Sequence, residues 1–512
     1  MNKLKTVISC PIGTFSGYGS RSRDLVKAII ESKKDDWDVK IMAQRWGNTS
    51  QNFIEENPEW QWLNEYILPQ GPLTSQPDIW MQITVCNEFT PVGKYNIGIS
   101  AGIETTLAHN SWIEGCNRMD LVLVSSKHSK DILLNTKYEK RNQQTNIPEG
   151  LLEVTTPVEV LFEGADINTY QPDIPTNRNI GLKDIPESFC FLFTGAWLQG
   201  DIGQDRKNVG LLIKAFYETF KNNPNPPALV LKTSTVTTSY MDKREILRRI
   251  DAIKKSVVAK SLPKVYLLHG DFTDYEINEL YNNSKVKAMV SLTKGEGFGR
   301  PLLEFSLVNK PILVSNWSGH LDFLNRDQTL LIDGKLENVH HSALMENIII
   351  PESQWFNIDT MQLGQKFIEI YKNNKGWTEL ARKQGLYNRE HFSWDKMKDL
   401  MNEYFIKYIP NLPRVQQLVL PKLMKKISLP TLNILIIREN KETIKRLYNE
   451  YKKEYLNELY DTPLKFKKEN NSYTVFKDNG DKLAFFTFRF EYDIDNSPIN
   501  HKKYNLDKYW NI

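Results

Sequence analysis

The 512-residue sequence has few cysteines and lacks any long apolar run. Its four cysteines, Cys10, Cys86, Cys116 and Cys190, are scattered, without the close spacing of a metal site or a disulfide-rich domain. No apolar stretch approaches the roughly 20 residues that a membrane-spanning helix needs. The apolar part of the N-terminus is also too short for the core of a signal peptide. We therefore expect a reduced, cytoplasmic protein without a transmembrane segment.

The sequence also lacks a strong excess of charge, because 66 Lys and Arg residues face 62 Asp and Glu residues, a formal net charge of +4. A dedicated nucleic-acid-binding protein would be more basic, although this balance is compatible with one basic face. The hydrophobic content of 40% and the charged content of 25% are typical of a soluble globular protein. At this length one hydrophobic core is not sufficient, so about three domains are expected.

The most informative stretch combines a strand, a glycine-rich loop and a helix. Residues 286–292 (VKAMVSL) read as a buried strand, and the loop KGEGFG at 294–299 leads into a proline-led helix. In an open α/β sheet the ligand lies beyond the carboxyl ends of the strands, so Glu296 and Glu304 would both face it. Two carboxylates suit a polyhydroxylated ligand, since carboxylates accept hydrogen bonds from hydroxyls.

This stretch resembles the E-x7-E signature of retaining, nucleotide-sugar-dependent glycosyltransferases of the GT-B fold, the group 1 families. The similarity continues downstream with SGHLDFL, which follows the second acid at the family's distance. It covers residues 1–410 and is strongest at 290–324 and 95–126. An ordinary strand–loop–helix unit of another α/β protein is the alternative interpretation.

Alternating strand and helix patterns indicate an α/β protein with parallel, doubly wound sheets. With the resemblance, they predict two Rossmann-like domains facing across a cleft (GT-B) and a small α+β appendage. The expected parts are an acceptor-side Rossmann-like domain at 1–165, a linker at 166–188, a nucleotide-sugar-binding Rossmann-like domain at 189–392, a crossover helix at 393–410, a linker at 411–430 and the appendage at 431–512.

The appendage lies outside the resemblance. Its sequence predicts a strand at 433–437, a helix at 442–459 and two aromatic-rich strands at 473–476 and 483–490, joined by an Asn-Gly turn. The basic side of the helix could contact an acceptor or a partner, or could be an ordinary solvated surface. A D-x-D pattern at 493–495 follows, but a metal role is rejected because no large sheet surrounds it.

Positive charge and backbone amides can stabilise a departing diphosphate without a metal ion. Arg206 and Lys207 precede a helix predicted at 209–220, where side-chain charge adds to the free amides of the helix end. Lys207 matches the family's diphosphate-binding lysine, and Arg206 is a candidate to replace the family's missing arginine. Lys294 could pair with Glu296 or bind phosphate. A plain exposed basic turn is the alternative for residues 206–207.

Two glycine loops are expected to approach the donor. Gly17 and Gly19 follow the first predicted strand and match the family's N-terminal glycine loop, since glycines permit close backbone approach to a phosphate. Gly297, Phe298 and Gly299 would contribute from the second domain. A merely structural turn is the alternative for the first loop.

The segment NIGISAGIETT at 96–106 is similar to glycosyltransferases encoded by tailed phages. Many relatives carry a histidine near the position of Glu104, where it contacts the transferred sugar. The resemblance therefore implies that Glu104 orients a sugar hydroxyl or the acceptor. His109 is offset, so either residue could serve the acceptor side, and an ordinary histidine on a helix surface is the alternative for His109.

The resemblance implies an enzyme that moves a sugar from a nucleotide-diphosphate sugar to an acceptor hydroxyl, with retention and without an obligatory metal. Glu296 would contact the donor sugar, Glu304 the ribose, and Lys207 the diphosphate. The acceptor stays open: a glycan, a lipid-linked sugar, or DNA with hydroxymethylated bases, as for some phage enzymes working in the host cytoplasm. A catalytically silent nucleotide-sugar-binding protein is the rival from another class.

Overall fold

The computed structural model describes most of the chain, which divides into two compact units, Met1–Gln416 and Gln417–Ile512. The described residues are 3–142, 145, 147–174, 182–235 and 237–412, together with the backbone of 465–469, 472–476 and 482–487.

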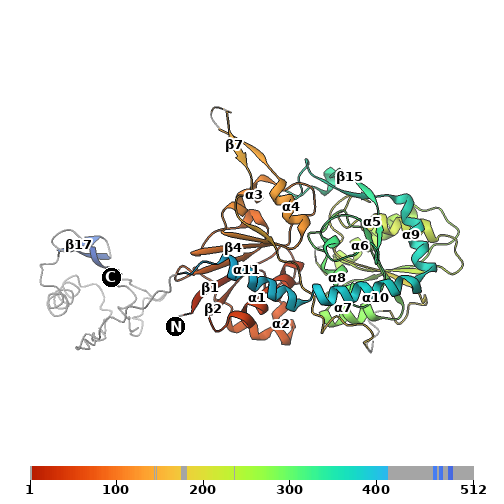
Figure 1. The fold of residues 1–512 in the computed structure, drawn as a ribbon, viewed down its shortest axis with the longest axis horizontal. Helices are drawn as coiled ribbons and strands as arrows, with labels where there is room; N and C mark the ends of the chain where they lie inside the picture. Colours follow the sequence, from red (N-terminus) through yellow and green to blue (C-terminus); the bar gives the residue numbers. More distant parts are fainter. Residues whose placement is uncertain are drawn as a thin grey trace, which may run out of the picture. The chain divides into compact units, whose positions relative to one another are not determined.

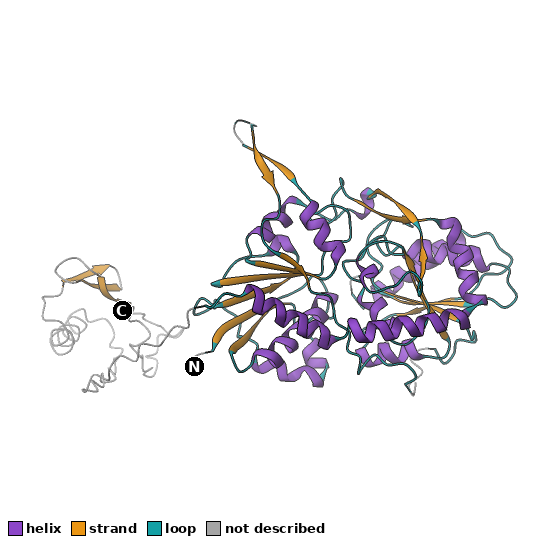
Figure 2. Cartoon of the chain, in the orientation of Figure 1, coloured by secondary structure: helices purple, strands orange, loops and turns teal. Residues whose placement is uncertain are grey.

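The first part of the larger unit, called here the first lobe, is built on a six-stranded sheet in the order β2-β1-β3-β4-β5-β8, with all neighbours parallel. Helices cover both faces (Figure 2), so β4 is buried along its whole length. The elements are β1 (Leu4–Cys10), α1 (Gly17–Lys33), β2 (Trp37–Ala43), α2 (Phe53–Glu56), β3 (Ile79–Ile83), β4 (Tyr95–Ser100), α3 (Asn110–Asn117), β5 (Leu121–Val124), α4 (Lys127–Asn135) and β8 (Val158–Val160).

The second lobe repeats this plan with the parallel sheet β11-β10-β9-β12-β13-β14 (Figure 1). Its elements are β9 (Cys190–Thr194), α5 (Val209–Phe220), β10 (Ala228–Lys232), α6 (Tyr240–Lys255), β11 (Val265–Leu268), α7 (Asp274–Asn282), β12 (Val286–Ser291), α8 (Arg300–Ser306), β13 (Ile312–Ser315), β14 (Leu330–Ile332), α9 (Thr360–Lys372) and α10 (Asn374–His391). In each sheet the chain starts in an inner strand and then builds outward to both sides. This is the doubly wound pattern, whose ligands bind where the strand order reverses.

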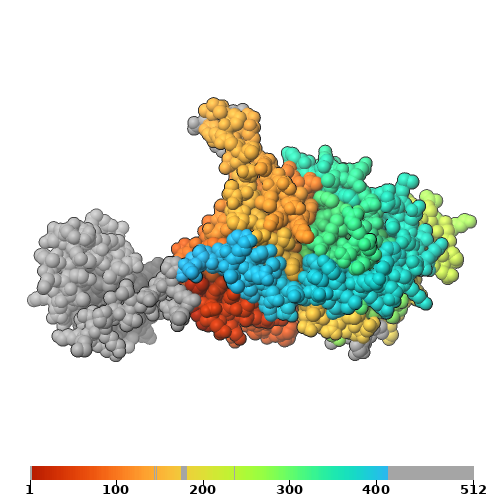
Figure 3. All heavy atoms as spheres, in the orientation of Figure 1, coloured from red at the N-terminus to blue at the C-terminus, as the bar shows by residue number. Residues whose placement is uncertain are grey.

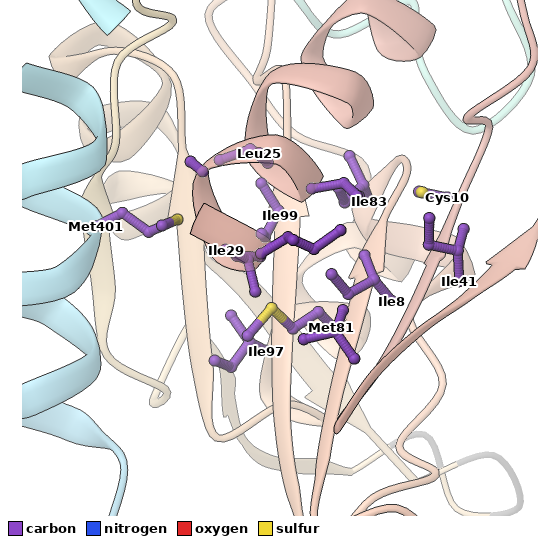
Figure 4. Packing of buried hydrophobic residues seen from close by; sticks show 14 of the residues in the cluster. Ile8, Cys10, Leu25, Ile29, Ile41, Met81, Ile83, Ile97, Ile99 and Met401 are labelled. Carbon is purple, nitrogen blue, oxygen red and sulfur yellow. The ribbon is translucent and has the colours of Figure 1, made fainter. Parts of the chain in front are cut away.

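The core of the first lobe includes a helix from far along the chain. Side chains of the sheet and of α1 pack together around Ile97 (Figure 4). Helix α11 (Trp394–Tyr408) follows the second lobe in sequence, yet its Met397, Met401 and Phe405 are buried in this first core. Burying each such side chain contributes about 1.5–3 kcal/mol.

The chain passes between the lobes at two adjacent places. Ala165 N–H donates to the carbonyl of Phe392 at 3.0 Å, and Trp394 N–H donates to the carbonyl of Ala165 at 2.8 Å. Ala165 and Ser393 thus form a parallel bridge. The outgoing and returning segments are therefore hydrogen-bonded to each other where they connect the lobes.

Two hairpins depart from the doubly wound plan. One consists of β6 (Tyr138–Arg141) and β7 (Pro148–Leu152) and projects from the surface of the first lobe (Figure 3). The other pairs β15 (Gly334–Asn338) with β16 (Gln354–Ile358), with residues 339–353 between them.

In the smaller unit the structure describes one antiparallel sheet, β17 (Lys465–Glu469), β18 (Ser472–Phe476) and β19 (Lys482–Thr487). The predicted strand at 473–476 coincides with β18, and β19 covers part of the second predicted strand. The strand predicted at 433–437, the helix at 442–459, the Asn-Gly turn and the D-x-D pattern lie outside the described residues. Within the described part, no helix is both long and apolar enough to span a bilayer.

Candidate functional site

Acids and cations selected from the sequence meet beyond the carboxyl ends of β9 and β12. The loop after β9 carries Arg206 and Lys207, and the loop after β12 carries Glu296. These two strands are neighbours at the point where the strand order reverses, so the two loops share one edge of the sheet.

The carboxylate of Glu296 lies between two cations. The ammonium group of Lys207 contacts one carboxylate oxygen, and Nη1 of Arg206 lies 3.4 Å from the other. The Glu296 side chain is only 8% exposed. Burial would raise its pKa, but Lys207 and Arg206 outweigh burial and lower the pKa to about 2. Glu296 is therefore ionised at neutral pH.

Arg206 links Glu296 and Lys207 to the first lobe. Its Nη1 donates to the carbonyl of Gly295 at 2.8 Å, and its Nη2 lies 3.7 Å from Oε1 of Glu104. Burial alone would lower the pKa of Arg206, but Glu104 and Glu296 raise it. We call Glu104, Arg206, Lys207 and Glu296 the charged cluster. It contains the residues that the sequence analysis assigned to the donor sugar (Glu296), the diphosphate (Lys207) and a sugar or acceptor hydroxyl (Glu104).

Asn208 follows Lys207 in the segment predicted to bind phosphate, and it adjoins the charged cluster. It adopts a left-handed conformation (φ 58°) immediately before α5, where Asp205 caps the helix by accepting from Val209 N–H at 3.0 Å. Both polar side-chain atoms of Asn208 are buried and have no hydrogen-bond partner within the described part of the chain. A buried amide without partners is costly, so Asn208 is a candidate ligand contact.

Glycines in the loop 294–299 of the second lobe allow the backbones of the two lobes to come into contact. A Cβ on Gly295 would overlap the carbonyl oxygen of Glu104, and one on Gly297 would overlap that of Ala101. Gly299 has φ 98°, a conformation that favours glycine. Gly297 thus packs on the first lobe. The ring of Phe298 is 2% exposed and packs 4.9 Å from that of Phe323, so its side chain belongs to the core.

Gly17 and Gly19, the glycines that follow β1 in the first lobe, differ in their surroundings. A Cβ on Gly19 would overlap the backbone of Thr14, so packing requires this glycine. Gly17 is exposed, and apart from its chain neighbours and the backbone of its own helix no atom lies within 4 Å of the position of a Cβ. The intervening Tyr18 accepts from Ala101 N–H at 3.1 Å, so this loop lies against the segment that leads to Glu104.

Glu304 takes part in a second ion network. Its Oε1 accepts from Nε of Arg300 at 2.7 Å, and Arg300 also pairs with Asp24 of α1 in the first lobe. Burial raises the pKa of Glu304 to about 7, because Arg300 only partly opposes burial and Asp274 adds to it. Arg300 stands inside the sequence signature, but the signature gave no indication of its pairing with α1.

Lys294 and His109 lie outside the charged cluster. The Lys294 ammonium is directed to Asn357 and lies 5.1 Å above the Trp355 ring, so it does not form the pair with Glu296 that was one of its two predicted roles. Its other predicted role, binding phosphate, stays a prediction. Burial lowers its pKa to about 8. His109 caps α3, its Nδ1 accepting from Ser111 N–H at 3.3 Å. Of the two acceptor-side candidates, only Glu104 reaches the cluster.

His320 is a further candidate that the sequence analysis missed. It is fully buried, and its Nε2 donates to the carbonyl of Ser315 at 2.7 Å. The proton is therefore on Nε2, and Nδ1 is an acceptor without a partner among the described residues. His320 adjoins Gly299, and burial lowers its pKa. The only available signal was its position in SGHLDFL.

The described residues contain no candidate metal site. Among them, no group of three or more His, Cys, Asp or Glu side chains is arranged to hold a metal ion. Independence from metal therefore stays a prediction.

No family model and no curated protein sequence matches the chain. Solved structures with similar folds include a glycosyltransferase from Rickettsia africae ESF-5 (13% identity, TM-score 0.54, covering 80% of this chain and 100% of that one). They also include sucrose-phosphate synthase from Thermosynechococcus elongatus (11%, 0.51, 79% and 99%) and alpha,alpha-trehalose 6-phosphate synthase from Burkholderia multivorans (10%, 0.50, 80% and 99%). At these identities the likeness shows the fold. With the two parallel sheets, it confirms the predicted pair of Rossmann-like domains of the GT-B class.

Proposed function

We propose that this protein is a glycosyltransferase that moves a sugar from a nucleotide-diphosphate sugar to an acceptor hydroxyl, with retention of configuration. The observation that carries the proposal is the charged cluster, in which Lys207, Arg206 and Glu296 of one lobe meet Glu104 of the other. The similar solved structures named above include a glycosyltransferase and two sugar-phosphate synthases, which supports the same assignment.

In this proposal the cations Lys207 and Arg206 stabilise the leaving diphosphate. As the bond to the sugar breaks, negative charge grows on the diphosphate, and Lys207 and Arg206 are the groups that would stabilise it. Asn208 would add a neutral hydrogen-bond donor at the start of α5. Removing one preorganised donor of this kind typically lowers the rate by about 10²–10³-fold.

The two acids of the cluster would orient the sugar. Ionised Glu296 only accepts hydrogen bonds, so it suits hydroxyls of the transferred sugar while it also holds Lys207 in place. Glu104, 27% exposed, would act from the opposite lobe on a sugar or acceptor hydroxyl. Glu304 would accept from ribose hydroxyls, with Arg300 fixing its orientation.

Retention follows in this proposal from a displacement on one face of the sugar. Glu296 already neutralises two cations, which makes it a poor nucleophile, so no covalent sugar–enzyme intermediate is invoked. The bond from the anomeric carbon to the diphosphate oxygen breaks, and the bond to the acceptor oxygen forms on the same face. The acceptor's proton passes to the leaving diphosphate. Catalysis is then positioning and electrostatic stabilisation, without an obligatory metal.

The direct test incubates the full chain with a panel of nucleotide sugars and measures released nucleotide. Release with at least one donor, retention read from the anomeric NMR signals of the product, and loss of release in Glu296→Ala are the expected results, and inversion would overturn the retaining mechanism. Donor binding without release in any condition would instead support a silent binder. Adding EDTA tests the metal independence separately, and DNA containing hydroxymethylated bases tests the nucleic-acid acceptor.

A further inference from the structure

A cavity of about 550 Å³ lies between the lobes, beside the start of α3. The first lobe contributes His109, Asn110 and Tyr138, and the second lobe contributes most of segment 344–352, which belongs to the connection between β15 and β16. Its volume falls within the 300–1,000 Å³ range of small-molecule sites. We propose that it binds the acceptor, and that this acceptor is a neutral or amino-bearing saccharide.

The wall formed by the second lobe is held in place by hydrogen bonds. The indole N–H of Trp112, itself 3% exposed, donates to the carbonyl of Asn347 at 2.7 Å across the lobes. Within the segment, Met345 N–H donates to Ile349 at 3.1 Å and Ile349 N–H donates back at 2.9 Å. The cavity is therefore a built feature of the lobe contact.

The polar groups of the lining suit hydroxyls and exclude phosphate. Glu346 and Glu352 are exposed carboxylates, and none of the ion pairs within the described residues includes either of them. Because Nδ1 of His109 accepts from Ser111, its Nε2 carries the proton and can donate. The described lining residues include no lysine or arginine. A phosphorylated acceptor or nucleic acid would meet repulsion here.

Most of the remaining lining is apolar, apart from Asn110 and Asn347. Leu344, Met345, Ile349 and Ile350 contribute aliphatic surface, and Tyr138, whose hydroxyl donates to the carbonyl of Ala108, contributes an aromatic ring. A saccharide ring has apolar C–H faces and a polar hydroxyl edge. Apolar walls with two carboxylate acceptors and a few neutral polar residues match both parts.

The cavity is connected to the charged cluster along both walls. Thr106 N–H donates to the carbonyl of Gln354 at 2.9 Å, and Gln354 N–H donates to the Thr106 hydroxyl at 2.9 Å. Glu104 lies two residues before Thr106, and Glu352 lies two residues before Gln354. His109 follows Glu104 by five positions, so the chain between them spans at most about 18 Å. An extended saccharide in the cavity could place its terminal hydroxyl at the cluster.

The experiment measures saccharide binding apart from turnover, because this assignment rests on the proposed function. The full chain is applied to a glycan array with neutral, amino-bearing and phosphorylated saccharides, and the affinity for hits is measured by calorimetry. Two variants alter the cavity: Glu346→Lys with Glu352→Lys reverses its charge, and Asn110→Trp fills it. Glu114→Lys, an exposed acid on α3 outside the lining, is the matched control.

Binding of neutral or amino-bearing saccharides, weakened at least tenfold in both cavity variants and unchanged in the control, is the expected result. The assignment is overturned if no such saccharide binds, if phosphorylated ones bind preferentially, or if both cavity variants bind as the original does. Nucleotide release by the same samples reports on the proposed function alone. Saccharide binding without release from any donor would remove the transferase proposal and leave the saccharide site.

Discussion

Replacing Lys207 with methionine should destabilise the protein and remove its activity for two separable reasons. In the folded protein Glu296 has a pKa of about 2, against an ordinary 4.5, chiefly because Lys207 and Arg206 outweigh burial. That difference corresponds to about 3 kcal/mol of stability at neutral pH from Glu296 alone. Burial of Lys207 partly offsets this contribution, because it lowers the pKa of that lysine. Without Lys207 the buried carboxylate keeps only Arg206, so the free energy of unfolding should fall by about 3–5 kcal/mol.

A second variant separates the two effects. In Lys207→Met with Glu296→Gln, no uncompensated carboxylate remains, so most of the lost stability should return. Nucleotide release should stay at least about 100-fold below the original rate, since the cation for the diphosphate is still missing. Urea unfolding followed by tryptophan fluorescence and the nucleotide-release assay measure the two quantities. A double variant no more stable than Lys207→Met, or a single variant that releases nucleotide at the original rate, would refute the reasoning.

The ion pair between Glu296 and Lys207 also predicts how the stability of the protein depends on pH. Because the pKa of Glu296 is lowered on folding, its stabilising contribution is complete above the ordinary pKa near 4.5 and is lost as pH falls towards 2. Glu296→Gln has no such group at this position. The stability difference between the original protein and Glu296→Gln should therefore shrink on acidification over that window, as measured by urea unfolding at several pH values.

Three further predictions test other parts of the structure. Gly297→Ala should lower the free energy of unfolding by about 1–3 kcal/mol, because its Cβ meets the backbone of the first lobe. Gly17→Ala should leave that free energy unchanged and should raise the KM for the donor if phosphate approaches there. Equal destabilisation in the two variants would contradict the packing. Burial raises the pKa of Glu304 to about 7, so stability should fall as pH rises from 4.5 to 7, and Glu304→Gln should abolish this slope in urea unfolding. Met401→Ala should lower the free energy of unfolding by about 2–5 kcal/mol, because Met401 is buried. Ile406→Ala, at an exposed position of the same helix, should lower it by less than about 0.5 kcal/mol. Comparable losses in the two variants would argue against the burial of α11.

The helices and strands were predicted most accurately where the local sequence pattern favours the same structure as the tertiary packing. The helix predicted at 209–220 coincides with α5, and the strand predicted at 286–292 differs from β12 by one residue at its end. Such strands are buried on both faces and read as continuous apolar runs, and the glycine signature lies at the switch point of the sheet. These features were enough to predict the doubly wound fold and the loops that carry the charged cluster.

Features that depend on contacts between distant segments could not be predicted. Strand β15 reads GKLEN and is mostly exposed, so it has no apolar alternation, and its partner β16 follows after fifteen intervening residues. The cavity formed by that insertion was therefore not expected. The partners of Lys294 were misjudged for the same reason, because Asn357 and Trp355 lie on β16.

The position of α11 has a consequence for biosynthesis. On the ribosome, the strands of the first sheet emerge long before Met397, Met401 and Phe405, which complete their core. At about 5–20 residues per second, the intervening chain takes on the order of 10–50 s to translate. During that interval the nascent first lobe exposes the apolar surface that α11 will cover. Ribosome-associated chaperones should therefore contact it there, and any fragment released before residue 394 should aggregate unless the missing peptide is supplied in trans.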